Sequence, residues 1–114
     1  MELQYSELEN QIKRIKLIGS LDILGVGAIE TKFAAYCAGE NSRVIVDLSH
    51  VDFLASIGIR LLTINAKSLA SRGGRMALVG ATSDVRKVLE VTGIPDIIPV
   101  YDGIESAETV LLGI

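Results

Sequence analysis

Residues 43–62 read RVIVDLSHVDFLASIGIRLL, and this stretch decides the fold. Its first part, Arg43 to Leu48, is a continuous apolar run of strand length, which is typical of a strand buried on both faces of a sheet. Near Ser56 the pattern becomes helical, and we expect this helix to reach about Arg72 and to stop at Gly73-Gly74. A buried strand that leads directly into a helix indicates an α/β protein with a parallel sheet.

The chain after this stretch continues the alternation of strands and helices. We expect, in order, a buried strand from Arg75 to Gly80, a helix capped by Thr82 or Ser83 and closed by Gly93, a short edge strand from Ile97 to Val100 that contains Pro99, and a last helix with Ile104, Ala107, Leu111 and Leu112 on its apolar face.

The chain before this stretch predicts a hairpin and one helix. Two candidate strands, Leu3 to Leu8 and Gln11 to Gly19, are joined by a turn and are therefore expected to be antiparallel. Asp22 then caps a helix, closed by Gly39, whose apolar face carries Ile29, Phe33, Tyr36 and Cys37. The predicted fold is one α/β domain over residues 1–114, of order β-β-α-β-α-β-α-β-α, with a mainly parallel sheet and right-handed crossovers.

Composition narrows the classes of function. The 114 residues are 49% hydrophobic and 22% charged, which is typical of a globular domain. A formal net charge of -3 provides no basic face for nucleic acid. The single cysteine, Cys37, favours a reducing compartment, and the first residues, MELQYSELENQIKR, lack the apolar region of a signal peptide. With no apolar run of about 20 residues, we expect a cytoplasmic protein that does not insert into membranes.

Neither a serine hydrolase nor a dinucleotide-binding enzyme is well supported by the sequence. The segment LASIG around Ser56 has Leu54 where the nucleophile elbow G-x-S-x-G needs its first glycine, and the only histidine, His50, is expected between strand and helix in a solvated or capping role. The segment GVGAIE has Glu30 at the third position of a dinucleotide fingerprint, although Asp47 has the spacing of a ribose-binding acid.

Metal binding has even less support. A site would rest almost entirely on carboxylates such as Asp47 and Asp52, which we expect at the end of the buried strand, in turn or capping roles. We therefore predict neither a cofactor nor an enzymatic activity.

The order and spacing of several motifs resemble a known family over essentially the whole chain. These motifs are LIGSLD (17–22), VIVDLSHVDF (44–53), SIGIRLL (56–62), RGG (72–74) and VRKVLEVTGI (85–94). Together they look like a STAS domain, most similar to the stand-alone bacterial anti-sigma factor antagonists. Gly19 and Asp22 match the Gly-x-x-Asp element of that family, with Ser20 where Glu is common.

The resemblance implies a partner-switching module. Such proteins bind an anti-sigma factor or related GHKL-type serine kinase when unphosphorylated, are phosphorylated by it on a serine with ATP, and are reset by a PP2C-type phosphatase. The family motif reads roughly D-S-[ST]-G, which places the phosphate on Ser56 and the glycine on Gly58, while Ala55 and Ile57 replace the Asp and the second hydroxyl residue. The residues expected to bind the partner are Ser20, Asp22, Leu24, Leu54, Ala55, Ile57, Gly58 and Arg60.

Two readings of Ser56 stay open, a helix N-cap and a phosphate acceptor, and they are not exclusive. A phosphate at a helix N-terminus is stabilised by free N–H groups, and the same charge beside apolar side chains expels a partner. The alternative function is a non-switching STAS scaffold on a transporter, lipid-transfer or sensory complex, which the apolar Ala55 and Ile57 favour. Nucleotide binding, reported for some STAS relatives, finds no phosphate-cradling loop here, and the sequence leaves the oligomeric state open.

Overall fold

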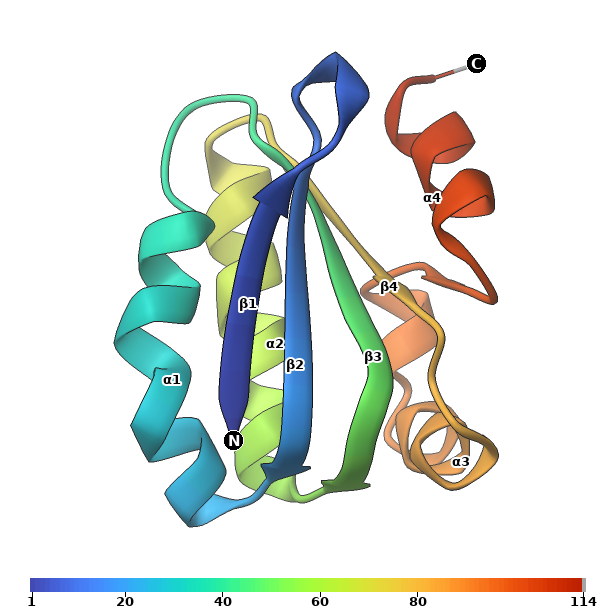
Figure 1. The fold of residues 1–114 in the computed structure, drawn as a ribbon. Coiled ribbons are helices and arrows are strands. Elements are labelled where there is room, and N and C mark those ends of the chain that lie inside the picture. Colours follow the sequence, from blue (N-terminus) through green and yellow to red (C-terminus); the bar gives the residue numbers. More distant parts are fainter. Residues whose placement is uncertain (114) are drawn as a thin grey trace.

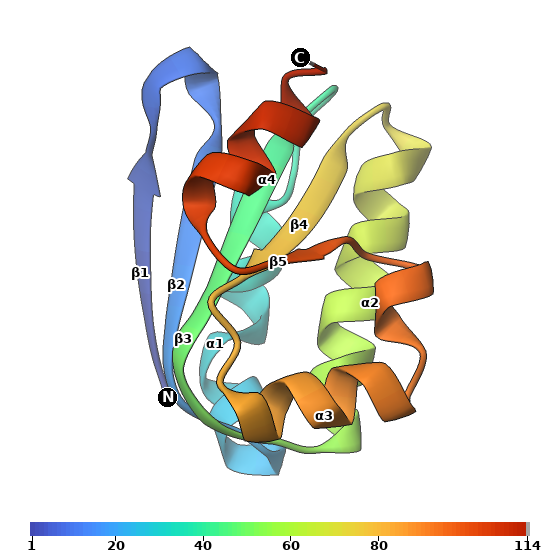
Figure 2. The same ribbon diagram turned by 90° about the vertical axis from the view of Figure 1, so that its right-hand side faces the viewer.

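Five strands form one sheet in the order in which they follow one another along the chain, β1-β2-β3-β4-β5. β1 to β4 are labelled in Figure 1, and β5 is labelled in Figure 2. The computed structural model describes residues 1–113. The strands are β1 (Glu2–Glu7), β2 (Lys13–Leu21), β3 (Arg43–Leu54), β4 (Arg75–Val79) and β5 (Val100–Tyr101). The helices are α1 (Ile23–Tyr36), α2 (Ser56–Ser71), α3 (Ser83–Val91) and α4 (Ile104–Leu111), with short 3-10 turns at Glu9–Gln11 and Ile94–Asp96. β1 and β2 form an antiparallel hairpin, and β2 to β5 are parallel.

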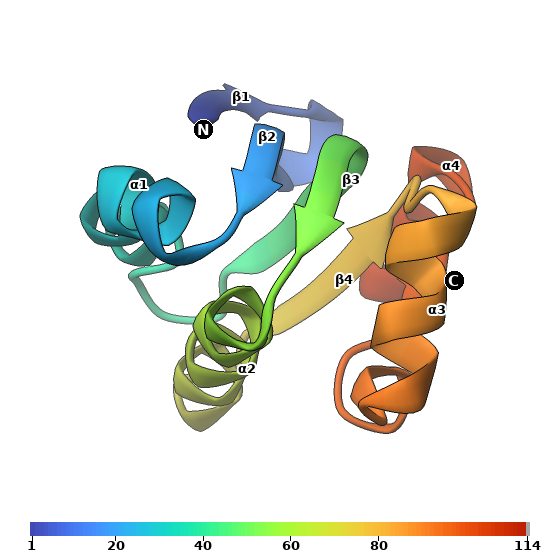
Figure 3. The ribbon, with the colours of Figure 1, turned by 90° about the horizontal axis from the view of Figure 1, so that it is seen from below.

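The helices are divided unequally between the two faces of the sheet (Figures 2 and 3). α1, α2 and α3 cover one face, where Phe33, Leu62 and Leu89 pack against strand residues in the larger core. α4 covers part of the other face, where Ala107 and Leu111 pack in a smaller core. None of the helices in residues 1–113 combines the length and apolar character that a membrane span requires.

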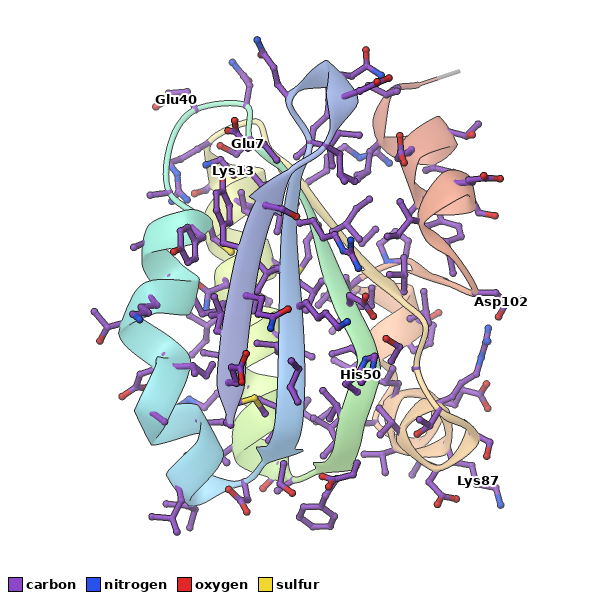
Figure 4. The ribbon with its side chains drawn as sticks, viewed as in Figure 1. Glu7, Lys13, Glu40, His50, Lys87 and Asp102 are labelled. Carbon is purple, nitrogen blue, oxygen red and sulfur yellow. The ribbon has the colours of Figure 1, made fainter. Side chains whose placement is uncertain are left out.

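The predicted α/β class, the mainly parallel sheet and the order of elements are confirmed. The bounds of β1, β2 and β4 differ from the predicted ones by one or two residues, and those of β3 and β5 differ by more. β3 does not end at Leu48: it continues to Leu54 because its last residues pair with the end of β2. His50 therefore lies inside a strand, not between a strand and a helix (Figure 4). β5 is Val100–Tyr101 instead of Ile97 to Val100.

Asp47 lies within β3, whereas we had expected it at the end of the strand, and its buried carboxylate forms an ion pair with the half-buried Arg14. Its carboxylate accepts hydrogen bonds from Arg14, at 3.1 Å, and from the Ser49 N–H, at 2.9 Å. Burial alone would raise the pKa of Asp47, but the hydrogen bonds from Ser49 and Arg14 and the charge of Arg14 outweigh it, so the pKa lies below its usual value. Through these contacts Asp47 links β3 to β2.

Cys37 faces the core, as expected, directly after the last residue of α1. Burial raises the pKa of its thiol to about 12, against the smaller opposing effects of Lys13 and Arg72. This shift favours the protonated thiol at neutral pH, which lowers its reactivity.

Two glycines let the first turns of α1 and α2 lie directly against the ends of the strands. A Cβ atom on Gly25 would lie 1.9 Å from the carbonyl oxygen of Ser20. A Cβ atom on Gly58 would lie 2.8 Å from Leu21 Cβ and from Leu54 Cδ1. Any larger residue at these two positions therefore pushes a helix away from the sheet.

We predict opposite effects for two alanine substitutions in α1. Gly25→Ala is expected to lower the free energy of unfolding by about 2 kcal/mol or more, because the new methyl group meets a backbone carbonyl. Gly27→Ala is the matched control: a Cβ atom there has no neighbour within 4 Å, so the substitution is expected to add up to about 1 kcal/mol through helix propensity. Urea unfolding measures both, and equal effects would contradict this account of the close approach.

Candidate functional site

The carboxyl edge of the sheet, where β2 and β3 end and α1 and α2 begin, carries most of the expected site residues (Figure 3). Leu21 and Leu54 are paired there as the last residues of the two parallel strands. The Ala55 N–H donates to the Leu21 carbonyl at 3.1 Å, so the pairing continues into the connection before α2. The helix N-termini of α1 and α2 are therefore held side by side.

The two helices start with different caps. Asp22 is the N-cap of α1, as expected, and its Oδ1 accepts a hydrogen bond of 2.8 Å from the Gly25 N–H. The N-cap of α2 is Ala55, which has no side chain able to accept such a bond. Ser56 is the first residue of the helix, so the reading of Ser56 as the N-cap is wrong.

The Ser56 side chain is exposed, and its hydroxyl forms no hydrogen bond within residues 1–113. It is therefore accessible to another protein. The N–H groups of the first turn point outward at this end of α2, which favours negative charge there.

An apolar rim lies beside Ser56 and consists of Ile23, Leu24 and Phe53, which are 74%, 85% and 55% exposed. Large apolar side chains that are grouped and exposed mark a protein-contact surface. Leu24 was expected there, whereas Ile23 and Phe53 were not named as contacts. Ile23, the first residue of α1, stands at the margin of the core-facing pattern of Val26, Ile29 and Phe33, and Phe53 lies on β3, to which that helical pattern does not apply.

The other expected contact residues take three different positions. Arg60 is exposed on α2, and Ala55 and Ile57 are half-buried at its start. Leu54 and Gly58 are buried, so they pack beneath the surface of the carboxyl edge and are not themselves accessible to a partner.

Ser20 and Asp22 are half-buried at the end of β2. The Ser20 hydroxyl donates to Asp52 Oδ1 at 2.7 Å, which ties β2 to β3 across the edge. Asp52 is thus placed near the strand end, as expected, and acts as a hydrogen-bond acceptor there.

The only histidine is not placed to activate Ser56. His50 lies four residues before the end of β3, about 13 Å along the strand from Leu54. Its Nδ1 pairs with the hydroxyl of the adjacent Ser49 at 3.0 Å. Within residues 1–113, no group of three His, Cys, Asp or Glu side chains is arranged to hold a metal ion. The arrangement at Ser56 is suited to recognition and modification by another protein.

The chain belongs to the STAS domain family, whose model matches residues 7–107. A relative from Bordetella bronchiseptica named as an anti-sigma factor antagonist, BtrV, is 31% identical over 91 residues, which are 80% of this chain and 78% of that protein. The anti-sigma-B factor antagonist of Staphylococcus aureus is 23% identical over 97 residues, 85% of this chain and 90% of the relative. The resemblance found in the sequence is thereby confirmed.

Solved structures confirm the fold. An anti-sigma factor antagonist (STAS) domain protein from Planctomyces limnophilus superimposes with a TM-score of 0.86 at 24% identity, covering 97% of this chain and 98% of that one. Unphosphorylated SpoIIAA, an anti-sigma factor antagonist, gives 0.78 at 24% identity, covering 99% and 98%. The STAS domain of a SulP transporter from Vibrio cholerae gives 0.68 at 26% identity, covering 85% and 77%.

The uncapped start of α2 leads to a second prediction. Ala55 already has the extended backbone of an N-cap, so Ala55→Asp is expected to raise the free energy of unfolding by about 1 kcal/mol. Ala70→Asp, on the exposed last turn of the same helix, is the control and is expected to lower it by roughly 0.5 kcal/mol, because a negative charge there opposes the helix dipole. Chemical denaturation at neutral pH measures both, and no gain for Ala55→Asp would show that the helix start is satisfied in another way.

Proposed function

We propose that this chain is an anti-sigma factor antagonist that works as a partner-switching module. One observation carries the proposal: the exposed Ser56 hydroxyl stands at the first residue of α2, directly beside the apolar rim. Membership of the STAS family and relatives named as anti-sigma factor antagonists support the general role. The proposed partners are an anti-sigma factor of the GHKL serine kinase type and a PP2C-type phosphatase.

In the unphosphorylated state the partner kinase covers the apolar rim. Removing Ile23, Leu24 and Phe53 from water supplies a favourable free energy of about 25 cal/mol per Å² of apolar area. The half-buried Ala55 and Ile57 extend this surface toward α2 without a charge. Binding to this surface occupies the kinase and releases the protein that it had held.

Phosphorylation then reverses the binding. The kinase transfers the γ-phosphoryl group of ATP to Ser56 Oγ, which loses its proton, and ADP leaves. The product carries about -1.5 to -2 charges at neutral pH. The free energy needed to remove this charge from water against the rim exceeds the favourable free energy of the apolar contact, so the partner dissociates.

The protein itself has no catalytic part in this cycle. The helix dipole of α2 and its free N–H groups stabilise the phosphate. Arg60 lies one helical turn beyond Ser56, at the i,i+4 spacing that brings side chains together, and forms no ion pair within residues 1–113. The phosphatase hydrolyses the phosphoester and restores the binding surface. We place the cycle in the cytoplasm, where ATP is present, and assign it no cofactor.

The switch is tested at Ser56 with a GHKL-type serine kinase from the same host. Incubation with ATP is expected to add one phosphate, seen by intact mass, and Ser56→Ala is expected to remove this labelling. Ser56→Asp is expected to weaken kinase binding at least tenfold, about 1.4 kcal/mol, in calorimetry. Ser83→Asp is the matched control, because Ser83 is the exposed first residue of α3, and binding is expected to stay unchanged. Full labelling of Ser56→Ala would reject the assignment.

The rim is tested with two residues of equal exposure. Leu24 is 85% exposed and Val91, on α3, is 86% exposed, so replacing either by Asp leaves the core intact. The helix dipole favours Asp at Leu24, in the first turn of α1, and opposes it at Val91, the last residue of α3, so the stability of each variant is measured beside its affinity. Leu24→Asp is expected to weaken kinase binding at least tenfold, because it places a charge in the apolar contact, whereas Val91→Asp is expected to leave it unchanged. Equal affinities for the two variants would place the interface elsewhere.

A non-switching scaffold is the second candidate function. It is favoured by the likeness to the STAS domain of a SulP transporter and by the apolar Ala55 and Ile57 beside Ser56. The two functions differ in one outcome: a scaffold keeps its partner after Ser56→Asp, and a switch loses it.

A further inference from the structure

A second surface feature, the α1–α2 groove, runs between the two helices away from the carboxyl edge. It has a volume of about 590 Å³ and is open to solvent along its length. Its lining residues come from about two turns of each helix: Val26, Glu30, Thr31, Ala34, Ile57, Arg60, Leu61, Ile64 and Asn65. Most of the groove lies beyond the rim and Ser56, so the switch described above does not account for it.

The groove combines an exposed apolar wall with a buried amide. Ile64 is 52% exposed on α2, although a large apolar side chain is more stable in the core. Asn65 is only 8% exposed, and its Nδ2 donates to the Leu61 carbonyl at 2.9 Å. Its Oδ1 accepts no hydrogen bond from any donor in residues 1–113. Because Oδ1 is not fully buried, it reaches solvent at the groove, where a donor from a bound molecule can take the place of water.

The two walls carry opposite charges. Glu30 is exposed on the α1 wall and Arg60 on the α2 wall. Neither forms an ion pair within the part of the chain that the structure describes. A molecule lying along the groove is therefore offered a negative charge on one side and a positive charge on the other.

We propose that the α1–α2 groove binds an amphipathic helix of the partner protein. Apolar side chains at i, i+3 or i+4, and i+7 of that helix enter the groove, a basic side chain pairs with Glu30, and an acidic side chain pairs with Arg60. A polar side chain of the same helix donates to Asn65 Oδ1. The inference rests on the proposed function, because the helix belongs to the kinase that also covers the rim.

The dimensions and charges select a helix over other occupants. The nine residues of α1 from Val26 to Ala34 span about 12 Å, which is about two helical turns. A small molecule in a groove open along its length stays largely in water, whereas ligand pockets bury about 70–90% of their ligand. Glu30 repels nucleic acid and anionic lipid headgroups. A helix with a basic and an acidic flank pairs with Glu30 and Arg60 at the same time. Its direction along the groove depends on which of its flanks is basic.

The steric test compares two neighbouring alanines on α1. Ala34 lines the groove and Ala35 does not, and both are exposed, so phenylalanine at either position needs no burial in the fold. Ala34→Phe is expected to weaken kinase binding at least tenfold in calorimetry, and Ala35→Phe is expected to leave it unchanged. If Leu24→Asp abolishes binding while Ala34→Phe does not, the proposed function stands and the groove proposal fails.

The charge test uses a synthetic, stapled amphipathic helix of about 15 residues, with leucines on one face, lysines on one flank and glutamates on the other. It needs no kinase, so it also decides the groove proposal if no kinase binds and the switch is wrong. Two-dimensional NMR of the labelled protein is expected to show shifts at Ala34 and Ile64 and none at Ser83.

Charge reversal on the protein makes this test specific. Glu30→Arg alone and Arg60→Glu alone are each expected to weaken peptide binding at least fivefold. The double variant is expected to restore binding, because the free helix then lies in the opposite direction. Lys67→Glu, on the same helix but outside the groove, is expected to have a smaller effect than Arg60→Glu. The absence of NMR shifts at the groove residues would overturn the proposal. Binding of free laurate, a fatty acid, without binding of the helix would overturn it as well, because the groove would then take a lipid chain instead.

Discussion

The parallel pairing between the ends of β2 and β3 is the interaction on which the rest of the structure depends. Leu21 pairs with Leu54, and the Leu21 carbonyl accepts the Ala55 N–H. This contact fixes where α1 and α2 begin, and Gly25 and Gly58 bring both helices against it. The Ser56 hydroxyl, the apolar rim and the mouth of the α1–α2 groove all take their positions from it. A displacement of α1 or α2 would move the Ser56 hydroxyl, the apolar rim and the mouth of the groove apart.

The opposite end of α1 is held by side chains from other elements, so the helix is fixed at both ends. Lys13 Nζ, from β2, donates to the carbonyls of Tyr36 and Ala38, both at 3.0 Å (Figure 4). Arg72, which follows α2, donates to the carbonyls of Cys37 and Gly39 at 2.9 and 3.0 Å. Positive side chains are favourable at a helix C-terminus, where carbonyl groups are otherwise unpaired. These four hydrogen bonds hold the C-terminal end of α1 in place.

Local patterns in the sequence were sufficient for most of the fold. The continuous apolar run of β3, the Asp22 cap and the closing Gly93 depend on neighbours in the chain and were predicted correctly. The end of β3 was not, because Ser49, His50 and Asp52 are polar and read as a loop. Their strand conformation comes from pairing with β2, a segment about 30 residues earlier, and Asp47 likewise finds its partner Arg14 on that strand. Such long-range pairs leave no local signal.

The sequence by itself determined the α/β class, the order of elements, the STAS resemblance and the position of Ser56 near the start of a helix, because each follows from spacing within a few residues. Only the tertiary structure decided that Ala55, not Ser56, is the N-cap, that Ile23 and Phe53 join Leu24 in one rim, and that Asn65 lies buried beside a groove. The physical reason is that exposure depends on which elements pack together. Ile23 and Phe53 are apolar enough for a core, and they are exposed because no element of residues 1–113 covers the carboxyl edge beside Ser56.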